Sequence, residues 1–240
     1  MILLRLVAPV ALTLVAGAMV YAAQEPMAGR GAPAASFPAV TRPVAPIVSP
    51  TWGDSSERDA AHEVLQIAAR LKLHAGMTVG DLGAGNGYDT LRLASLVGPS
   101  GRVVAEDVDP SALQALSAQA TQRHLSNVTI ALGEPQDPRL PPRSLDAAIL
   151  VHMYHEIAHP YAFLYNLAGA MRPSAQVGVE ELDRPTGSHG TPPALLRCEF
   201  EAVGYRVQSF APLTGGLGYF AVFASPSTPP APQRIHACRA

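Results

Sequence analysis

Short apolar runs alternate with longer segments of helical periodicity from Thr51 to Ala224, and this alternation restricts the fold more than any other feature of the chain. The runs MTVGDLG, LDAAILV and AQVGVEEL are nearly continuous, as expected for strands that are buried on both faces. Strands that alternate with helices predict a parallel sheet covered by helices on both faces. We therefore expect one α/β domain at 51–224, with its functional site at the carboxyl ends of the strands.

The expected elements follow one another in a regular order. Pro110 stands at the start of one helix, where its missing N–H costs nothing, and Gly98 with Pro99 ends another. Helices are expected at 57–72, 88–98, 110–124, 160–171 and 191–204, and strands at 77–83, 102–107, 127–132, 145–151, 175–182, 205–211 and 218–224.

The segments outside this domain have a different character. Residues 1–23 contain one basic residue, Arg5, then an apolar run and small residues that suit cleavage after Ala22. This pattern predicts an export signal and hence a periplasmic or secreted protein. An uncleaved membrane anchor is the alternative, since a run of about 18 apolar residues is borderline for a bilayer. The Pro/Ala-rich segment 24–50 is expected to be an extended linker, and the similar tail 225–240 to be disordered.

Charge and cysteine content restrict the partners. The net charge is −2 and charged residues make up 15% of the chain, so no basic patch of the kind that binds nucleic acid is expected. Cys198 and Cys238 are the only cysteines, and Cys238 lies in the tail. They predict neither a disulfide framework nor a Cys-rich metal site.

The stretch VGDLGAGNGY places Gly83, Gly85 and Gly87 between an apolar strand and a helix. Glycine is required where a turn needs positive φ or where the backbone must approach a ligand closely. A dinucleotide fingerprint would need a third glycine at the position of Tyr88, which weakens that interpretation. Asp81 precedes the loop and disfavours an anion, so an amine or another cation is the more natural ligand.

Two further strand ends carry acids. VVAEDVDP ends the second strand with Glu106 and Asp107, where an acid can accept hydrogen bonds from ribose hydroxyls. The third strand ends before Glu134, which can accept a hydrogen bond from an adenine amino group. The three strand ends together would hold an amino acid portion, a ribose and a base.

With these motifs the chain resembles the class I S-adenosylmethionine-dependent methyltransferases. It resembles more narrowly the small exported or predicted methyltransferases that share ERD, VGDLGAGNGY, AEDVDP and YHEIAHP. The resemblance covers 52–223. It implies a Rossmann-like domain with helices on both faces of a mostly parallel, seven-stranded sheet, whose last strand is antiparallel. It also implies S-adenosylmethionine as cofactor.

The resemblance assigns roles to individual residues. It implies that Asp81 lies near the methionine amino group, that Asp107 holds the ribose and that Glu134 lies by the adenine, with Asp137 as the alternative. The glycines let the backbone pass the cofactor. The cofactor-binding residues implied in this way are Asp81, Gly83, Ala84, Gly85, Gly87, Asp107 and Glu134.

The stretch MYHEIAHP contains the pattern H-E-x-x-H, in which two histidines on one helical face hold zinc. Pro160 directly follows His159, so a helix through both histidines is disfavoured, whereas Pro160 suits the first turn of the next helix. We predict a loop after the fourth strand and no metal ligand. His155, with Glu156 as partner, is predicted to be the catalytic base, since histidine titrates near neutral pH. The alternative is that His152 and His155 only line or support the loop.

The acceptor is predicted by elimination to be a small molecule. HMYHEI does not match the Asn or Asp followed by Pro-Pro-Tyr of nucleic-acid N-methyltransferases, and the cysteines of an arsenic methyltransferase are absent from this region. The sequence thus predicts S-adenosylmethionine-dependent methyl transfer. Two alternatives stay open: a zinc metallopeptidase that uses His155, Glu156 and His159, and a nucleoside-binding module without catalysis.

Overall fold

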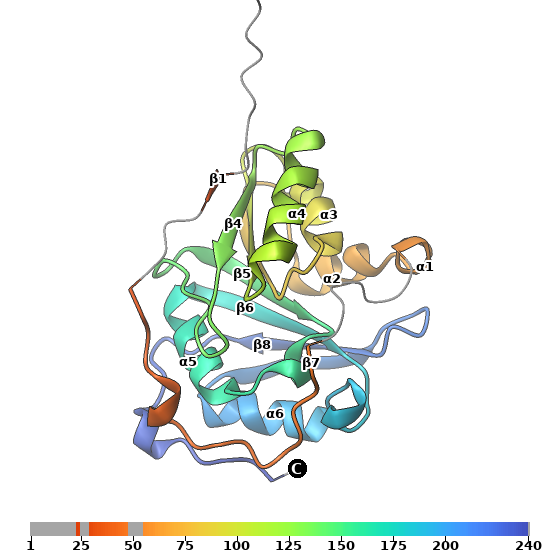
Figure 1. Ribbon diagram of the computed structural model, residues 1–240. Helices are drawn as coiled ribbons and strands as arrows, with labels where there is room; N and C mark the ends of the chain where they lie inside the picture. Colours follow the sequence, from red (N-terminus) through yellow and green to blue (C-terminus); the bar gives the residue numbers. More distant parts are fainter. Residues whose placement is uncertain (1–22, 25–28, 48–54, 240) are drawn as a thin grey trace, which may run out of the picture.

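The computed structural model describes residues 23–24, 29–47 and 55–239 as one α/β domain (Figure 1). Within these residues eight strands form a single sheet in the order β1-β4-β3-β2-β5-β6-β8-β7. Strands β2 to β8 are the seven that the sequence predicts, and the two-residue β1 (Ala23–Gln24) pairs with the free edge of β4. Residues 1–22, which hold nearly all of the expected export or anchor segment, lie outside the described residues.

The predicted mixed sheet is confirmed. β2 is parallel to β3 and β5, and the parallel arrangement continues to β4 on one side and β6 on the other. The last strand, β8, runs antiparallel to both of its neighbours, β6 and β7. The strands are β2 (Thr78–Leu82), β3 (Arg102–Asp107), β4 (Val128–Leu132), β5 (Leu145–Val151), β6 (Met171–Glu181), β7 (Arg206–Pro212) and β8 (Tyr219–Ala224).

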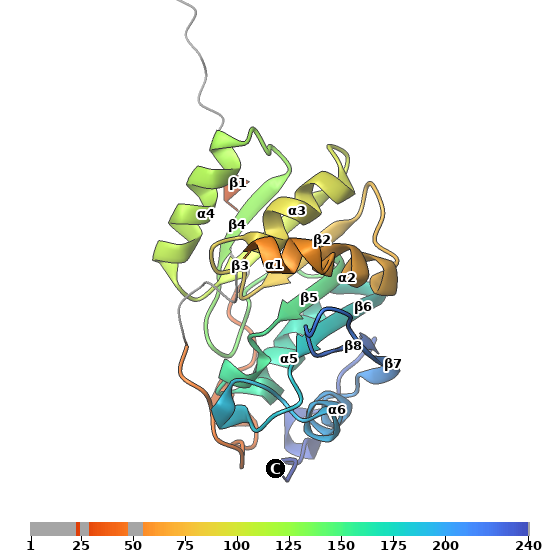
Figure 2. The same cartoon turned by 90° about the vertical axis from the view of Figure 1, so that its right-hand side faces the viewer.

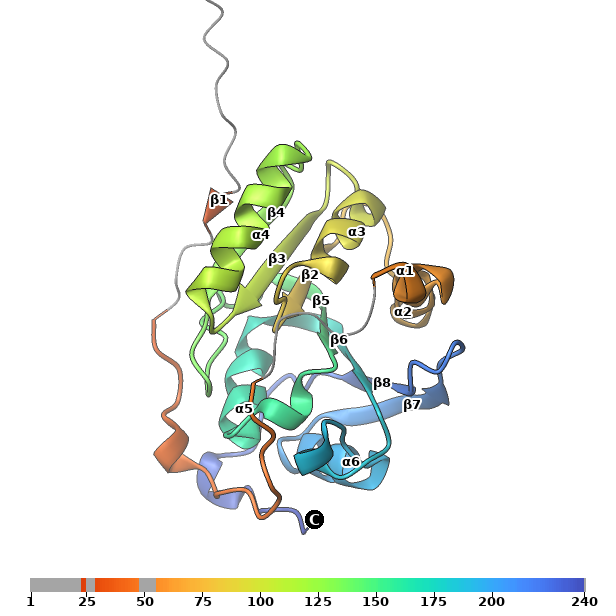
Figure 3. The ribbon, with the colours of Figure 1, turned by 45° about the vertical axis from the view of Figure 1, so that its right-hand side comes forward.

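Helices cover both faces of the sheet (Figures 2 and 3). Buried side chains of α2, α3 and α4 share one apolar cluster, which includes Ile67, Leu93 and Leu116. Those of α5 and α6 belong to the cluster on the other face, with Leu164 and Phe200. In the described residues no helix has both the length and the apolar character needed to cross a bilayer. The helices are α1 (Ser55–Ala60), α2 (Glu63–Leu71), α3 (Tyr88–Val97), α4 (Pro110–Gln122), α5 (Pro160–Ala170) and α6 (Pro193–Ala202).

The first expected helix, at 57–72, is broken into α1 and α2. His62 lies in the left-handed region with φ 53°, which a continuous helix does not allow. The break lets Arg58 donate to Glu63 and, at 3.0 Å, to Asp89 of α3. The prediction of one continuous helix is therefore wrong, and the break places a cation near the carboxyl edge of the sheet.

The described part of the expected linker, 29–47, is held firmly against the domain. Its Arg42 is 4% exposed, and its Nε donates to Glu199 of α6 at 2.9 Å. Its guanidinium also donates to the carbonyl oxygens of Tyr154 and Ile157 at 3.5 and 3.3 Å. The segment is irregular, as its composition predicts, but it is not a free spacer, because a buried ion pair fixes it.

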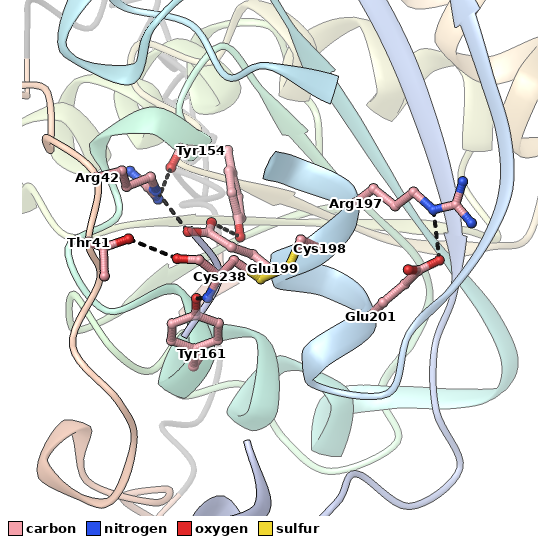
Figure 4. The surroundings of a disulfide bond; sticks show 9 residues. All are labelled: Thr41, Arg42, Tyr154, Tyr161, Arg197, Cys198, Glu199, Glu201 and Cys238. Carbon is pink, nitrogen blue, oxygen red and sulfur yellow. Dashed lines mark hydrogen bonds and ion pairs between the residues drawn. A yellow bond between two sulfur atoms is a disulfide. The ribbon is translucent and has the colours of Figure 1, made fainter. Parts of the chain in front are cut away.

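The tail, expected to be disordered, is likewise fixed over 225–239. Cys238 forms a disulfide with Cys198 of α6, its N–H donates to the hydroxyl of Tyr161 at 2.7 Å, and its carbonyl accepts from Thr41 at 2.8 Å (Figure 4). The sequence also failed to predict this disulfide. The composition of the tail predicted disorder, since the tail has few apolar residues of its own to bury. It is ordered because the disulfide and the facing segment at Thr41 supply contacts from other parts of the chain.

Loss of the disulfide is expected to destabilise the domain. The Cys198→Ser/Cys238→Ser double variant should lose about 2–4 kcal/mol of unfolding free energy, because its unfolded chain regains the freedom of an open loop. Urea unfolding with and without dithiothreitol measures this loss. The reductant should lower the stability of the wild type to that of the double variant and leave the variant unchanged. Equal stability of the oxidised and reduced wild type would contradict the prediction.

Candidate active site

A cavity of about 330 Å³ lies at the carboxyl ends of the parallel strands. Small-molecule sites commonly have volumes of roughly 300–1,000 Å³. The wall is formed by the loops that follow β2, β3, β4 and β5, together with α1 and the start of α3. The lining residues that matter below are Arg58, Gly83, Ala84, Gly85, Asp89, Glu106, Asp107, Glu134, His152, Met153 and Glu156.

The glycine loop after β2 has no room for a side chain at Gly83 or at Gly87. Gly83 has φ 68°, and a Cβ there would lie 2.9 Å from the side chain of Met153. The N–H of Gly85 donates to Oδ2 of Asp107 at 2.8 Å, which ties the loop to the end of β3. Gly87 does not line the cavity. With φ 85°, it lets α3 begin where a Cβ would collide with Leu116 of α4.

The end of β3 brings two carboxylates to the cavity. Oδ1 of Asp107 accepts the N–H of Asp109 at 2.9 Å, so each oxygen of Asp107 has one backbone donor and one further lone pair. Asp107 can therefore accept hydroxyl groups of a ligand. Oε1 of Glu106 is buried and has no hydrogen-bond partner among the described residues. Burial raises the pKa of Glu106 well above its ordinary value.

Arg58 and Asp89 form a charged pair on the cavity wall that sequence reasoning missed. Nη2 of Arg58 donates to Oδ2 of Asp89 at 3.0 Å, and the guanidinium lies 3.6 Å from the ring centre of Tyr88. Burial raises the pKa of Asp89 to about 7, against the effect of Arg58. Oδ1 of Asp89 has no partner in the described part of the chain. The motif ERD contains Arg58, but only the break between α1 and α2 turns it toward the cavity.

Asp81 lies behind the glycine loop and does not line the cavity. It is 2% exposed, and its Oδ2 accepts from the hydroxyl of Thr90 at 2.5 Å. Burial raises the pKa of Asp81 to about 6. Asp89, the second residue of α3, lines the cavity, whereas the role of Asp81 beside a methionine amino group stays a prediction.

Glu134 lines the cavity, as expected, while the alternative at this position, Asp137, does not. Asp137 is buried and accepts backbone N–H groups of Gly31 and Arg139 at 2.7 and 2.8 Å. Glu134 accepts from the side chain of Gln136 at 2.7 Å. The two acids after β4 therefore differ in their contacts. Asp137 accepts a hydrogen bond from the N-terminal segment, and Glu134 lines the cavity.

The loop after β5 presents His152, and not His155, to the cavity. His152 lies in the left-handed region with φ 52°, and its Nε2 is 3.2 Å from Oε1 of Glu180. His155 is buried, and its Nδ1 contacts both oxygens of Glu181 at 2.9 and 3.0 Å. Its neighbour Glu156 does line the cavity. Of the predicted base and its partner, Glu156 therefore lines the cavity and His155 does not, and their catalytic role stays a prediction.

The helix required by the H-E-x-x-H pattern does not form. His155 and Glu156 belong to the short 3-10 helix Tyr154–Glu156, whereas His159 is the exposed residue before α5. Pro160 is the first residue of α5, as predicted. The two histidines therefore do not share a helical face, and the metallopeptidase arrangement of His155, Glu156 and His159 is not present.

The strand order, the glycine loop and the acids at the next two strand ends define a class I S-adenosylmethionine-dependent methyltransferase fold. The family described as "Methyltransferase domain" matches residues 73–193. The chain therefore belongs to the methyltransferase domain family. S-adenosylmethionine is the cofactor of this class.

Two curated relatives are similar to parts of the chain. Nocamycin O-methyltransferase of Saccharothrix syringae is 30% identical over 107 residues, which are 43% of this chain and 37% of the relative. The ubiquinone/menaquinone biosynthesis C-methyltransferase UbiE of Pseudomonas fluorescens is 25% identical over 146 residues, 60% of this chain and 54% of the relative. The chain thus spans about a third to a half of the length of these relatives.

Solved structures share the fold at low sequence identity. A SAM-dependent methyltransferase from Aquifex aeolicus has a TM-score of 0.62 at 23% identity, and covers 72% of this chain and 100% of its own. The [4+2]-cyclase SpnF has a TM-score of 0.61 at 19% identity, and covers 77% of this chain and 71% of its own. Because a protein named a cyclase shares this fold, the fold alone does not determine the reaction.

The cavity residues fit S-adenosylmethionine. A Cβ at Gly83 would fill the glycine edge of the cavity, and Oδ1 of Asp89 and Oε1 of Glu106 are buried without partners among the described residues. Four acids, Asp89, Glu106, Asp107 and Glu134, surround a space that has Arg58 as its opposing cation. This excess of acids suits a ligand that carries positive charge together with hydroxyl and amino donors.

Asp107→Ala is expected to weaken S-adenosylmethionine binding by at least about 1 kcal/mol, close to tenfold in Kd, because a charge-assisted hydrogen bond is lost. The Gly85 N–H also loses its acceptor, so the loop is less ordered in the variant. Isothermal titration calorimetry measures the change. Glu201→Gln, an exposed change on α6, is the control and should bind like the wild type. An unchanged Kd for Asp107→Ala would remove this residue from the cofactor site.

Proposed function

We propose that this chain transfers the methyl group of S-adenosylmethionine to a small-molecule acceptor beside His152, Met153 and Glu156. The observation that carries the proposal is a single cavity that joins the glycine loop and Asp107 to the polar residues after β5. When bound, S-adenosylmethionine supplies a methyl group activated by a sulfonium. The main task of the protein is therefore to align an acceptor with that group, which can lower a barrier by several kcal/mol.

The cofactor would be held at the ends of β2, β3 and β4. The backbone at Gly83 and Gly85 allows close approach, Asp107 accepts ribose hydroxyls, and Glu134 accepts from the adenine amino group. Arg58 and Asp89 supply a cation and an anion for the charged amino acid end. Oδ1 of Asp89 has no partner among the described residues and supports a role in binding an ammonium group.

The acceptor would bind at the end of β5, where His152 is held neutral. Burial lowers the pKa of the His152 imidazole to about 3, and nearby Arg58 contributes in the same direction. Burial raises the pKa of its partner Glu180 well above the ordinary value. A neutral imidazole does not repel a sulfonium, and it can accept a hydrogen bond from an acceptor hydroxyl or amine. These properties suit the orientation of a nucleophile at neutral pH.

The names of the curated relatives support a small-molecule acceptor. One is named an O-methyltransferase for nocamycin and the other a C-methyltransferase of ubiquinone and menaquinone biosynthesis. The two names imply different acceptor atoms, oxygen in one case and carbon in the other. Oxygen and carbon nucleophiles differ in their need for a base. A binding module without turnover remains the rival function, and turnover distinguishes the two.

His152→Asn is expected to lower kcat by roughly 10- to 100-fold, at the low end of what proton transfer and orientation contribute. The Kd for S-adenosylmethionine should change little. Formation of S-adenosylhomocysteine with a panel of hydroxylated and aminated small molecules measures turnover, and calorimetry measures binding. His159→Asn is the matched control and should keep the wild-type kcat. Cofactor binding without turnover on any acceptor would favour the binding module.

We also propose that the domain functions in an oxidising compartment outside the cytosol. Two independent features support this: the signal-like pattern at 1–23, and a disulfide that joins the tail to α6. Expression of the full chain in a bacterium, followed by thiol alkylation in intact cells, tests the proposal. We expect Cys198 and Cys238 to be protected from alkylation until a reductant is added. Alkylation of both cysteines without reductant would show a cytosolic, reduced domain.

A further inference from the structure

Three side chains of types that can ligate a metal, His155, Glu156 and His189, lie close together beside the cavity. His155 and Glu156 belong to the 3-10 helix Tyr154–Glu156, and His189 directly follows a second 3-10 helix, Thr186–Ser188. One ligand atom from each residue lies within 4.8 Å of the others. Among the described residues, this is the group of three potential metal ligands found so close together. Compared with the H-E-x-x-H pattern of the sequence, it contains His189 in place of His159.

His155 is oriented as a metal ligand would be. Its Nδ1 contacts both carboxylate oxygens of Glu181 at 2.9 and 3.0 Å, and its backbone N–H donates to the same carboxylate at 3.3 Å. A carboxylate only accepts, so Nδ1 carries the proton and Nε2 presents its lone pair. That Nε2 lies 3.9 Å from Oε1 of Glu156. Metal-bound histidines commonly have such an outer carboxylate, which fixes the ring and its tautomer.

His189 is held close to His155 by an unusual backbone. It has φ 55° and ψ 60°, in the left-handed region. The loop before it is anchored by the Thr186 hydroxyl, which donates to the carbonyl of Pro43 at 2.7 Å. The His189 ring meets the His155 ring edge-on, with centroids 5.3 Å apart. Its Nδ1 is buried and has no hydrogen-bond partner among the residues that the structure describes.

We propose that His155, Glu156 and His189 bind a divalent transition-metal ion of the Zn²⁺ class, with Glu181 as the outer carboxylate. Two imidazoles and one carboxylate suit such an ion, whereas Ca²⁺ and Mg²⁺ prefer oxygen ligands. Metal–ligand bonds of about 2.0–2.1 Å place neighbouring donors roughly 3.3 Å apart in a tetrahedral site. The donor atoms now lie within 4.8 Å of one another, with 3.9 Å between Nε2 of His155 and Oε1 of Glu156, so ion binding requires the donors to move closer together.

The position of Glu156 connects this site to the cavity. Glu156 lines the cavity together with His152 and Met153, so an ion bound to it lies at the acceptor end. Three protein ligands leave a fourth position open, and an oxygen of the acceptor can occupy it. This last step rests on the proposed methyl transfer. The binding of the ion does not, and it is measured without turnover.

Metal binding to the purified full chain, prepared without a histidine tag, tests the proposal. Calorimetry with Zn²⁺ should give one ion per chain, and Co²⁺ should give the visible absorption bands of a site with mixed nitrogen and oxygen ligands. His189→Asn should weaken Zn²⁺ binding by at least about 100-fold. Asparagine suits this test because it tolerates the left-handed backbone of His189. Glu181→Gln should weaken binding by roughly 10- to 100-fold, as loss of an outer carboxylate does.

His159→Asn is the matched control, because His159 belongs to the sequence pattern but lies outside the group. It should bind Zn²⁺ like the wild type. Thermal melting and S-adenosylmethionine binding, measured for every variant, show that the domain is folded. The proposal is overturned if the wild type binds no stoichiometric ion, if folded His189→Asn binds as tightly as the wild type, or if His159→Asn alone abolishes binding.

Discussion

The parallel register of β2 with β3 and β5 is the constraint on which the whole site depends. Parallel strands deliver all their carboxyl ends to one edge of the sheet, so four loops that are far apart in the sequence meet around one cavity. The hydrogen bond from the Gly85 N–H to Asp107 then joins two of these loops directly. Each loop brings a different chemical group: backbone without Cβ after β2, carboxylates after β3 and β4, and an imidazole after β5. The direction of the strands therefore determines where the site forms, and the side chains of the four loops determine its chemistry.

Burial of acids shapes the chemistry of this edge. Asp81, Asp89, Glu106 and Glu180 are all buried, and burial raises the pKa of each carboxyl group. A buried carboxylate without a counter-charge is costly, and Arg58 compensates only part of this group. Asp89 and Glu106 line the cavity, where a cationic ligand would complete the compensation. Burial, with Arg58 nearby, also lowers the pKa of the His152 imidazole to about 3, so a neutral ring lines the cavity.

The N-terminal segment 29–47 and the tail 225–239 hold the loop after β5 in place. Arg42, from the N-terminal segment, donates to carbonyl oxygens of Tyr154 and Ile157 while it pairs with Glu199 of α6. The hydroxyl of Tyr154 donates to the other oxygen of Glu199 at 2.8 Å. The disulfide at Cys198 then attaches the tail next to this ion pair (Figure 4). Two segments whose composition predicts a linker and a disordered tail thus support the loop after β5. Their contacts are with other parts of the chain, and local composition carries no record of them.

The sequence by itself determined the order and type of the strands, the glycine loop and most of the helices, but not the break between α1 and α2. The antiparallel last strand was implied by the resemblance to the methyltransferase family, and the cofactor-facing roles of Asp107 and Glu134 stay predictions. The strands, the helices and the glycine loop follow from local signals, because apolar period and glycine spacing can be followed along the chain. Only the tertiary structure decided which of the histidines faces the cavity, that His189 and not His159 lies beside His155, and that Cys198 meets Cys238. The physical reason is that each of these depends on how irregular loops fold against one another. The backbone direction at a loop residue is set by the packing of distant segments, and spacing along the sequence does not encode it.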